Sequence, residues 1–296
     1  MTALLEAAIA KRHALLTDAT DALRLVDGAG DGLPGLVLET YAGRWLLATT
    51  GGVVPPPLRA WLAARGVACY WKRLDPRHQE PPAWLCGPQV AAPFLVREHG
   101  ICYEISFQAG YSQGIFLDQR TNRAEVRHLL RPGLKLLNTF AYTGAFSVAA
   151  AMAGAQTTTL DLAQPCLDWA KRNFSHNQLD PAAHHFCKGD TFHWLRRFAK
   201  QGRRFDAIVL DPPTFSRDAH GKVFRAGLDF GHLAALAAAV LAPGGWLLCC
   251  TNFRGITPGE FERQLRAAMP RPCHLHHAAM PPDFTDAPYL KSLWLR

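Results

Sequence analysis

Short apolar runs alternate with segments of helical spacing from Phe116 to the end of the chain. The predicted strands cover residues 135–138, 157–160, 184–187, 205–210 and 245–250. Helical spacing resumes after each strand, at Ala145, Pro165, Thr191, Leu228 and Pro258. Strands that alternate with helices of this length predict a parallel sheet with helices on both faces and right-handed crossovers. This pattern restricts the larger part of the chain to the α/β class.

The remaining segments predict a smaller domain ahead of this sheet. Strand patterns occur within residues 23–50 and near 67–72, 90–97 and 101–107, and a helical pattern occurs at 55–65; the helical pattern at 121–130 already belongs to the larger domain. At the other end, residues 274–278 and 291–295 predict two strands that pair at the sheet edge. Because 296 residues exceed one average domain of about 150, we expect an α+β domain over 1–112 and an α/β domain over 113–296.

Composition narrows the classes of function. The net charge of +8 and the pI of about 9.2 favour a nucleic-acid partner, although such a charge also serves solubility alone. There is no uninterrupted run of 18 apolar residues, and the N-terminus lacks the features of a signal peptide, so we expect a cytoplasmic protein without a membrane span. The eight cysteines form no C-x-x-C pair, so we expect no metal site.

Candidate ligand residues follow the predicted strands, where doubly wound sheets bind their ligands. The first segment reads N-T-F-A-Y-T-G-A over residues 138–145 and includes Phe140, Tyr142, Thr143 and Gly144. Glycine permits a close backbone approach, and the following helix N-terminus favours a carboxylate. The segment is not G-x-G-x-x-G, which weakens the case for a dinucleotide.

Two acidic residues follow the next two strands. Asp161 lies about twenty residues beyond the first loop, where a carboxylate can accept hydrogen bonds from both hydroxyls of a ribose. Asp190 can accept from an adenine amino group. Each residue has a structural alternative as a helix N-cap, near Gln164 and at Thr191 respectively.

The fourth segment reads D-P-P-T-F over residues 211–215. Two prolines fix the backbone, so the loop can present Asp211 and main-chain carbonyls to a planar amine or ring nitrogen. Phe215 is placed to stack on a base. A D-P-P turn can also serve only to connect two elements, but its place after the fourth strand favours a ligand role.

These segments together resemble the class I S-adenosylmethionine-dependent methyltransferase (SAM methyltransferase) fold, a Rossmann-like sheet. D-G-L-P-G-L-V at 31–37, F-L-D-Q-R-T-N-R at 116–123 and Y-L-K at 289–291 extend the likeness to the bacterial 23S rRNA methyltransferases of the cytosine-C5 and guanine-N7 kinds. Many members begin with a PUA domain, an RNA-binding module. This chain starts after the point where that domain would end, so the resemblance leaves RNA docking to the small domain and the basic surface.

The resemblance also separates two kinds of chemistry. Cytosine-C5 members carry a nucleophilic cysteine after the strand that follows D-P-P, and Asn252 takes that place here. The string T-N-F-R-G at 251–255 more closely resembles the guanine-N7 members. Cytosine C5 needs a transient thiolate adduct, whereas guanine N7 already has a lone pair and needs only alignment and charge stabilisation. We therefore expect methylation of guanine N7 in 23S rRNA without a covalent intermediate.

The resemblance assigns roles to single residues, with SAM as the cofactor. Gly144, Asp161, Asp190 and Asp211 would bind SAM together with the loop at 140–143, and Arg120 and Asn122 would close the pocket from below. Asp211, Pro212 and Asn252 would hold the base, with Pro213, Phe215 and Arg254 as further substrate contacts. Arg196, Arg197, Arg203 and Arg204 would touch phosphates or simply form a solvated face.

Three alternatives remain open at this point. A cytosine-C5 enzyme would use Cys249 or Cys250 as its nucleophile. A small-molecule methyltransferase could have inherited the same scaffold without the PUA domain. An RNA-binding protein that has lost catalysis is the third, and the acidic residues Asp161 and Asp211 argue against it. The sequence gives no indication of oligomeric state.

Overall fold

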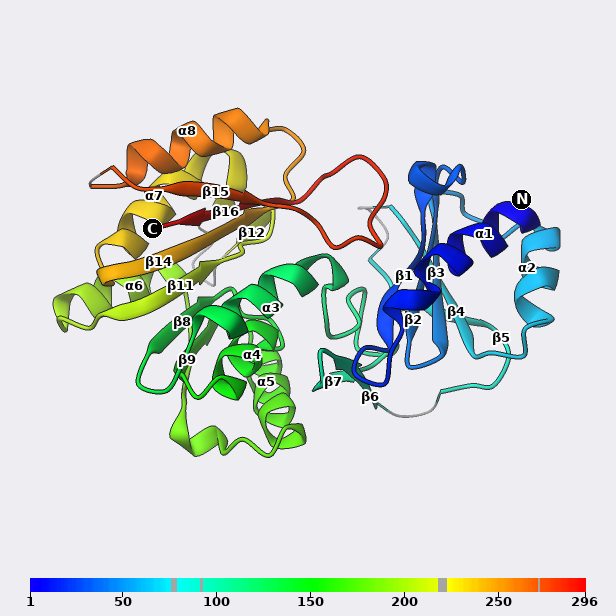
Figure 1. The fold of residues 1–296 in the computed structure, drawn as a ribbon, viewed down its shortest axis with the longest axis horizontal. Helices are drawn as coiled ribbons and strands as arrows, with labels where there is room; N and C mark the ends of the chain where they lie inside the picture. Colours follow the sequence, from blue (N-terminus) through cyan, green and yellow to red (C-terminus); the bar gives the residue numbers. More distant parts are fainter. Residues whose placement is uncertain (76–78, 91–92, 218–222, 271) are drawn as a thin grey trace. The chain divides into compact units, whose positions relative to one another are not determined.

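The computed structural model describes residues 1–75, 79–90, 93–217, 223–270 and 272–296, and its chain folds into two units (Figure 1). The first unit contains Met1–Arg120 and Pro281–Pro288, and the second contains Thr121–Met280 and Tyr289–Arg296. We predicted the domain boundary earlier in the chain, between residues 112 and 113. The sequence contained no sign that Pro281–Pro288 belongs to the first unit.

A seven-stranded sheet forms the centre of the second unit, in the order β10-β9-β8-β11-β14-β16-β15. The first five of these strands are parallel, and β16 and β15 are antiparallel to their neighbours. The strands are β8 (Lys135–Thr139), β9 (Gln156–Asp161), β10 (His185–Lys188), β11 (Phe205–Leu210), β14 (Leu241–Thr251), β15 (Leu275–Ala278) and β16 (Lys291–Leu295). The predicted parallel sheet and its paired edge strands are confirmed.

Helices cover both faces of this sheet (Figure 1). They are α3 (Arg120–Leu129), α4 (Ala145–Met152), α5 (Gln164–His176), α6 (Thr191–Lys200), α7 (Ala226–Ala238) and α8 (Pro258–Ala268). Successive strand residues alternate between two buried clusters: Ile208 packs with α6, α7 and α8, whereas Val209 packs with α3 and α4. This alternation follows from the twofold repeat of a strand, and burial of both faces explains the continuous apolar runs.

The first unit contains a five-stranded sheet in the order β1-β2-β3-β4-β5 and a separate β6–β7 hairpin. Its elements are α1 (Thr2–Arg12), β1 (Ala22–Asp27), β2 (Leu36–Tyr41), β3 (Arg44–Thr49), α2 (Pro56–Ala63), β4 (Cys69–Arg73), β5 (Ala83–Cys86), β6 (Phe94–Glu98) and β7 (Ile101–Ile105). Short 3-10 turns occur at His13–Leu15, Gly28–Asp31 and Leu117–Gln119, with a fourth in the second unit at Pro181–Ala183. The strand predicted near 90–97 starts at Phe94, and Ala91 and Ala92 lie outside the described residues.

The segment Pro281–Pro288 is bound into the first unit by buried charges. The Asp283 carboxylate is fully buried and accepts hydrogen bonds from the Arg120 guanidinium and from the Arg24 amide. The Arg12 guanidinium donates to the Asp283 carbonyl at 2.8 Å and to Asp31. Such pairing explains how several charged groups are tolerated away from water.

Two elements of the structure had no counterpart in the sequence prediction. These are β5 and the hairpin β12 (Phe215–Arg217) and β13 (Val223–Arg225), which directly follows the D-P-P turn. Strands of three residues are too short to show an alternating pattern. Within the described residues, no helix combines the length and the apolar character that a membrane span requires.

Candidate cofactor and base-binding site

Four parallel strands end side by side at one edge of the large sheet. The register pairs Thr139 with Leu160 and with Leu210, and it pairs Asp161 with Lys188. Between β8 and β11 the chain order reverses, and ligands of open α/β sheets bind at such a switch point. The candidate loops that follow these four strands therefore meet at one place.

The loop after β8 is held in a tight, strained shape. Phe140 and Tyr142 have φ values of 50° and 49°, which side chains other than glycine rarely adopt. Gly144 precedes α4 with φ 74°, and a Cβ atom there would lie 2.7 Å from the Cβ of Ala170 on α5. The position therefore needs glycine for its backbone angle and for its contact with α5. The Asn173 amide, which donates to the Thr143 carbonyl at 2.9 Å, fixes the loop from the same helix.

Asp161 connects the loops around it. Its carboxylate accepts from the Tyr142 amide at 2.8 Å and from the Ala163 amide at 2.9 Å, and its carbonyl accepts from the Gly189 amide at 2.9 Å. Burial raises the pKa of the carboxyl group, and the backbone donors oppose that shift. A carboxylate has about four acceptor positions, so it can also accept from ligand hydroxyls. The N-cap of α5 is Ala163 and has no side-chain cap hydrogen bond, so Asp161 is not the N-cap that the sequence offered as its structural alternative. The ribose role stays a prediction.

Asp190 caps α6. Its carboxylate accepts from the His193 amide at 2.8 Å, which is the N-cap arrangement that the sequence offered as the structural alternative. The residue is half-buried at the end of the loop that starts with Gly189. Its position is compatible with an adenine contact in addition to the cap.

The loop after β11 is joined to the loop after β14. The Thr214 hydroxyl donates to the Asn252 side-chain oxygen at 2.8 Å, so the D-P-P-T-F and T-N-F-R-G segments lie together. Pro212 is buried, whereas Pro213 and Phe215 are exposed, the latter to 54%. The sequence did not single out Thr214, although it stands inside the quoted motif.

Arg254 follows Asn252 and is exposed, with its guanidinium 5.5 Å from the centre of the Tyr289 ring. Both residues belong to the second unit. A substrate contact by Arg254 stays a prediction.

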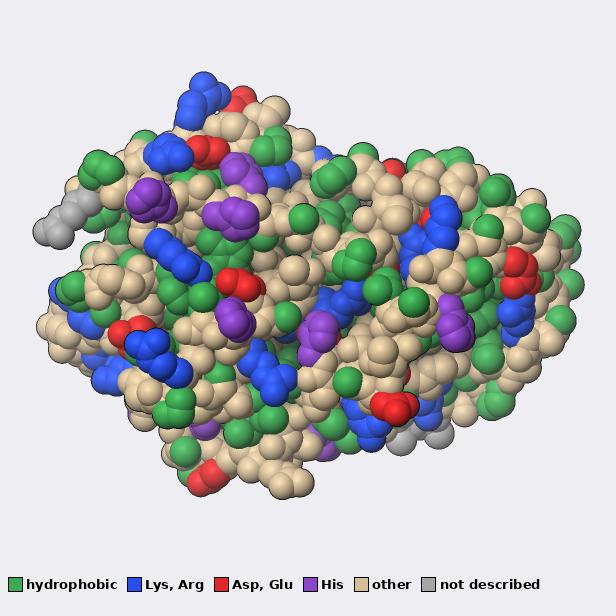
Figure 2. All heavy atoms as spheres, viewed as in Figure 1, with side chains coloured by type: hydrophobic (Ala, Val, Ile, Leu, Met, Phe, Trp, Pro, Cys, Tyr) green, Lys and Arg blue, Asp and Glu red, His purple; other side chains and the backbone are tan. Residues whose placement is uncertain are grey.

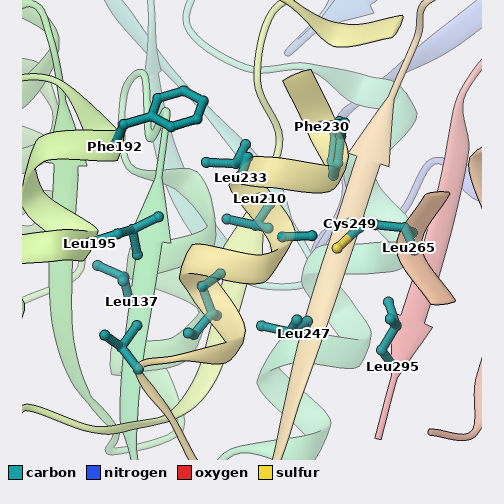
Figure 3. Close-up of a cluster of buried hydrophobic side chains, with 14 of the residues drawn as sticks. Leu137, Phe192, Leu195, Leu210, Phe230, Leu233, Leu247, Cys249, Leu265 and Leu295 are labelled. Atoms are coloured by element: carbon teal, nitrogen blue, oxygen red, sulfur yellow. The ribbon is translucent and has the colours of Figure 1, made fainter. Parts of the chain in front are cut away.

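The two cysteines of β14 point to opposite faces of the sheet, and both are fully buried. Cys249 lies in the cluster with α6, α7 and α8, where Figure 3 shows it among Leu247, Leu265 and Leu295. Burial strongly raises the pKa of its thiol. Cys250 lies in the opposite cluster and its sulfur is 3.6 Å from the Ser292 hydroxyl. Thiols in such surroundings are poor nucleophiles.

The side chains of Arg120 and Asn122 are buried, and each forms hydrogen bonds with other side chains of the protein. The Arg120 guanidinium pairs with Asp283 in the first unit. The Asn122 amide donates to the Ser292 hydroxyl at 2.9 Å in the second unit. These contacts explain why the two side chains are buried, and their predicted role at the cofactor is untested.

Two of the four arginines near α6 lie away from this edge. Arg203 and Arg204 directly precede β11 and therefore stand at its amino end. The Arg203 guanidinium lies 4.6 Å from the Phe198 ring centre, and that of Arg197 lies 4.8 Å from the ring of Trp194. On the face drawn in Figure 2, Lys and Arg side chains lie singly or in small groups, interspersed with acidic and uncharged ones. Net charge alone therefore does not locate a nucleic-acid site on that face.

The sheet order, the glycine turn after the first strand and the carboxylates at the next strand ends define a class I methyltransferase. The family model described as S-adenosylmethionine-dependent methyltransferase matches residues 55–296, and the chain belongs to this family. It is therefore a methyltransferase enzyme with SAM as its cofactor. Among the described residues, no group of three or more His, Cys, Asp or Glu side chains is arranged to hold a metal.

Proteins of known description are similar over most of this chain. It is 34% identical over 278 residues to YwbD of Bacillus subtilis, which is named as a ribosomal RNA large subunit methyltransferase; the match covers 90% of this chain and 70% of YwbD. It is 33% identical over 325 residues to a ribosomal RNA large subunit methyltransferase of Deinococcus radiodurans, covering 99% and 78% of the two chains. The solved structure of SMU.776, described as a methyltransferase complexed with SAH, superimposes with a TM-score of 0.90 at 29% identity, over 99% of this chain and 80% of that one.

Proposed function

We propose that this enzyme methylates a base of large-subunit (23S) ribosomal RNA, that the accepting atom is guanine N7, and that no covalent cysteine adduct forms. The names of its sequence relatives support the RNA substrate. The observation that carries the chemistry is the burial of both β14 cysteines on opposite faces, with Asn252 exposed at the end of that strand.

The strand-end residues fit the cofactor. Gly144 gives the loop the left-handed turn that leads into α4, and the N-terminus of that helix favours a carboxylate. Asp161 is fixed by backbone donors in an orientation that leaves acceptor positions for ribose hydroxyls. Asp190 would accept from the adenine amino group, and Phe140, Tyr142 and Thr143 would line the cofactor. Bound SAM supplies an electrophilic methyl group.

The joined loops would hold the base. Asp211 and the rigid backbone around Pro212 would accept from the guanine edge, and Phe215 would stack on a neighbouring base. Asn252, held by Thr214, would fix the plane of the base. Guanine N7 gains positive charge as it accepts the methyl group, and the Asp211 carboxylate would stabilise that charge. Alignment and electrostatics are sufficient for this reaction because N7 has its own lone pair.

The double variant Cys249→Ala, Cys250→Ala tests the absence of a covalent step. We expect methyl transfer from tritiated SAM to rRNA to stay within about tenfold of the parent, since only packing is lost. Asn252→Ala should lose more activity because its amide would contact the base. Cys69→Ala, Cys86→Ala is the matched control, as it removes two buried strand thiols in the first unit.

A second assay with 5-fluorocytidine-substituted RNA would trap a cysteine adduct at a cytosine. We expect none. A stable protein–RNA adduct, or complete loss of transfer in a double variant that is still folded, would support the cytosine-C5 alternative instead.

The small-molecule alternative makes a different prediction. An enzyme of that kind would transfer the methyl group to a metabolite and would show no affinity for rRNA even at low salt. The exposed aromatic and arginine side chains beside the candidate base site favour RNA over that alternative.

A further inference from the structure

A groove of about 680 Å³ begins at the proposed base site and lies wholly within the second unit. Its wall comes from the β12–β13 hairpin, the start of α7, the loop after β14 and one side of α8. Thr214 lines it and also bonds Asn252, so the groove is continuous with the candidate base-binding loops. A volume of this size accommodates a ligand of small-molecule dimensions rather than a folded domain.

The hairpin presents one face to the groove. Phe215 and Arg225 are cross-strand partners, so their side chains project from the same face, and both line the groove. Phe224 belongs to the other face, where it is buried against the Phe140 and Phe192 rings. The hairpin therefore has a core side and an open side, and the open side carries an aromatic ring next to a guanidinium group.

The floor of the groove is fixed in position. A Cβ atom on Gly227 would lie 2.7 Å from the Phe253 ring, and one on Gly255 would lie 2.3 Å from it, so both positions have room only for glycine. The Gln264 side chain donates to the Gly227 carbonyl at 2.9 Å and ties α8 to the start of α7. Such a surface exists before any ligand arrives, which lowers the ordering cost of binding.

The exposed side chains in the groove suit a single-stranded polynucleotide. Phe215 is 54% exposed and Leu228 is 74% exposed, although both are large and apolar. Arg225 and Arg263 are exposed and positive. Glu260 is the acidic group of the lining, and its carboxylate is bound to the Thr257 amide and hydroxyl in the capping box of α8. The groove therefore combines apolar surface for bases with an excess of positive charge for phosphates.

We propose that this groove holds the single-stranded RNA segment next to the target base, with a flanking base against Phe215 and Leu228 and the phosphates at Arg225 and Arg263. The assignment rests on the proposed RNA substrate and adds to it the part of the protein that selects the flanking sequence.

The double variant Arg225→Ala, Arg263→Ala tests the phosphate contacts. Each lost contact to single-stranded RNA should lower the slope of log affinity against log salt by about 0.7, so the slope should fall by about 1.4. We expect kcat/KM for an rRNA fragment to fall at least about tenfold, while SAM affinity measured by calorimetry stays at the parent value. Arg266→Ala is the matched control, because Arg266 lies on the same helix and pairs with Glu262 outside the groove.

The variant pair Phe215→Ala and Phe215→Tyr tests stacking. The alanine should weaken RNA binding by about tenfold, as expected for one lost base stack, and the tyrosine should restore it. Photo-crosslinking with 5-iodouridine beside the methylated nucleotide should attach RNA to the peptide that contains Leu228.

The outcomes separate the two proposals. If the parent methylates rRNA and the groove variants behave like Arg266→Ala, the groove assignment is wrong and the proposed function stands. If the parent transfers no methyl group to any rRNA fragment, the proposed function fails and the groove assignment fails with it.

Discussion

At the residue scale, Asp161 is the residue that connects the loops of the candidate cofactor site. It holds the loop after β8 through the Tyr142 amide and the loop after β10 through its own carbonyl. The sequence predicted its importance from its position after a strand. These hydrogen bonds were beyond prediction because they depend on the register of three strands.

We expect Asp161→Ala to weaken SAM binding by about tenfold or more, since hydrogen bonds to a charged acceptor contribute about 1.5–3 kcal/mol each. Isothermal calorimetry measures the affinity, and circular dichroism checks that the fold is intact. Asp168→Ala is the control, because Asp168 is an exposed aspartate on α5 whose contacts are local, a hydrogen bond from Gln164 and an ion pair with Lys171.

The pH dependence of the parent gives a second check on the same residue. Because burial raises the pKa of Asp161, its carboxylate should be protonated, and SAM affinity lost, at a higher pH than for an ordinary aspartate near 3.9. The effect on folding stability has the opposite sign. A carboxyl group whose pKa is raised in the folded state stabilises the fold at low pH, and this stabilisation is lost as the pH rises. Asp161 therefore does not drive acid unfolding. Equal SAM affinities for the parent and Asp161→Ala would show that Asp161 does not bind the cofactor.

Gly144→Ala should lower both stability and SAM affinity. The new methyl group would meet Ala170 at 2.7 Å, and the backbone would be strained at φ 74°. Together these effects should cost about 2–4 kcal/mol in urea unfolding. Gly133→Ala separates the two causes, since Gly133 has φ 90° and no atom within 4 Å of its Cβ position. Equal losses in the two variants would contradict the packing argument.

At the element scale, the strand rhythm predicted the parallel sheet and the order of its helices, because each strand is buried on both faces and helices alternate with the parallel strands. The β12–β13 hairpin was missed, since its strands have three residues each and no repeat to detect. The groove that we assign to RNA depends on this hairpin. The sequence therefore predicted the strand ends that carry the candidate cofactor residues, but not the hairpin beside the candidate base-binding loops.

Asp190→Asn distinguishes capping from cofactor binding at the start of α6. Asparagine caps a helix as well as aspartate does, so thermal stability should stay within about 0.5 kcal/mol of the parent. If Asp190 also accepts from adenine, SAM affinity should fall several-fold while the melting temperature is unchanged. Unchanged affinity would leave Asp190 as a cap alone. Asp180→Asn is the control, as Asp180 caps a short turn through the Ala182 amide.

At the scale of the whole molecule, the most distant contacts were the least predictable. Asp283 bonds Arg120 across 163 positions of sequence, and its carbonyl bonds Arg12 across 271. Contacts between residues so far apart leave no local pattern, which is why Pro281–Pro288 was not predicted to belong to the first unit.

Net charge should govern the encounter with RNA. With a charge of +8, affinity for an rRNA fragment should fall by about twentyfold between 50 and 200 mM salt if three phosphates of a single strand are contacted. SAM affinity over the same range should change little, which provides the internal control. Filter binding against salt concentration measures the slope, and a flat slope would favour the small-molecule alternative.

The central claim is methylation of an rRNA base at guanine N7, and nucleoside mass spectrometry tests it most directly. Large-subunit rRNA from a strain that lacks the gene should be incubated with the protein and with SAM that carries a deuterated methyl group. The account predicts labelled 7-methylguanosine, together with loss of one such residue in rRNA isolated from the deletion strain. Labelled 5-methylcytidine, or no labelled nucleoside at all, would contradict it.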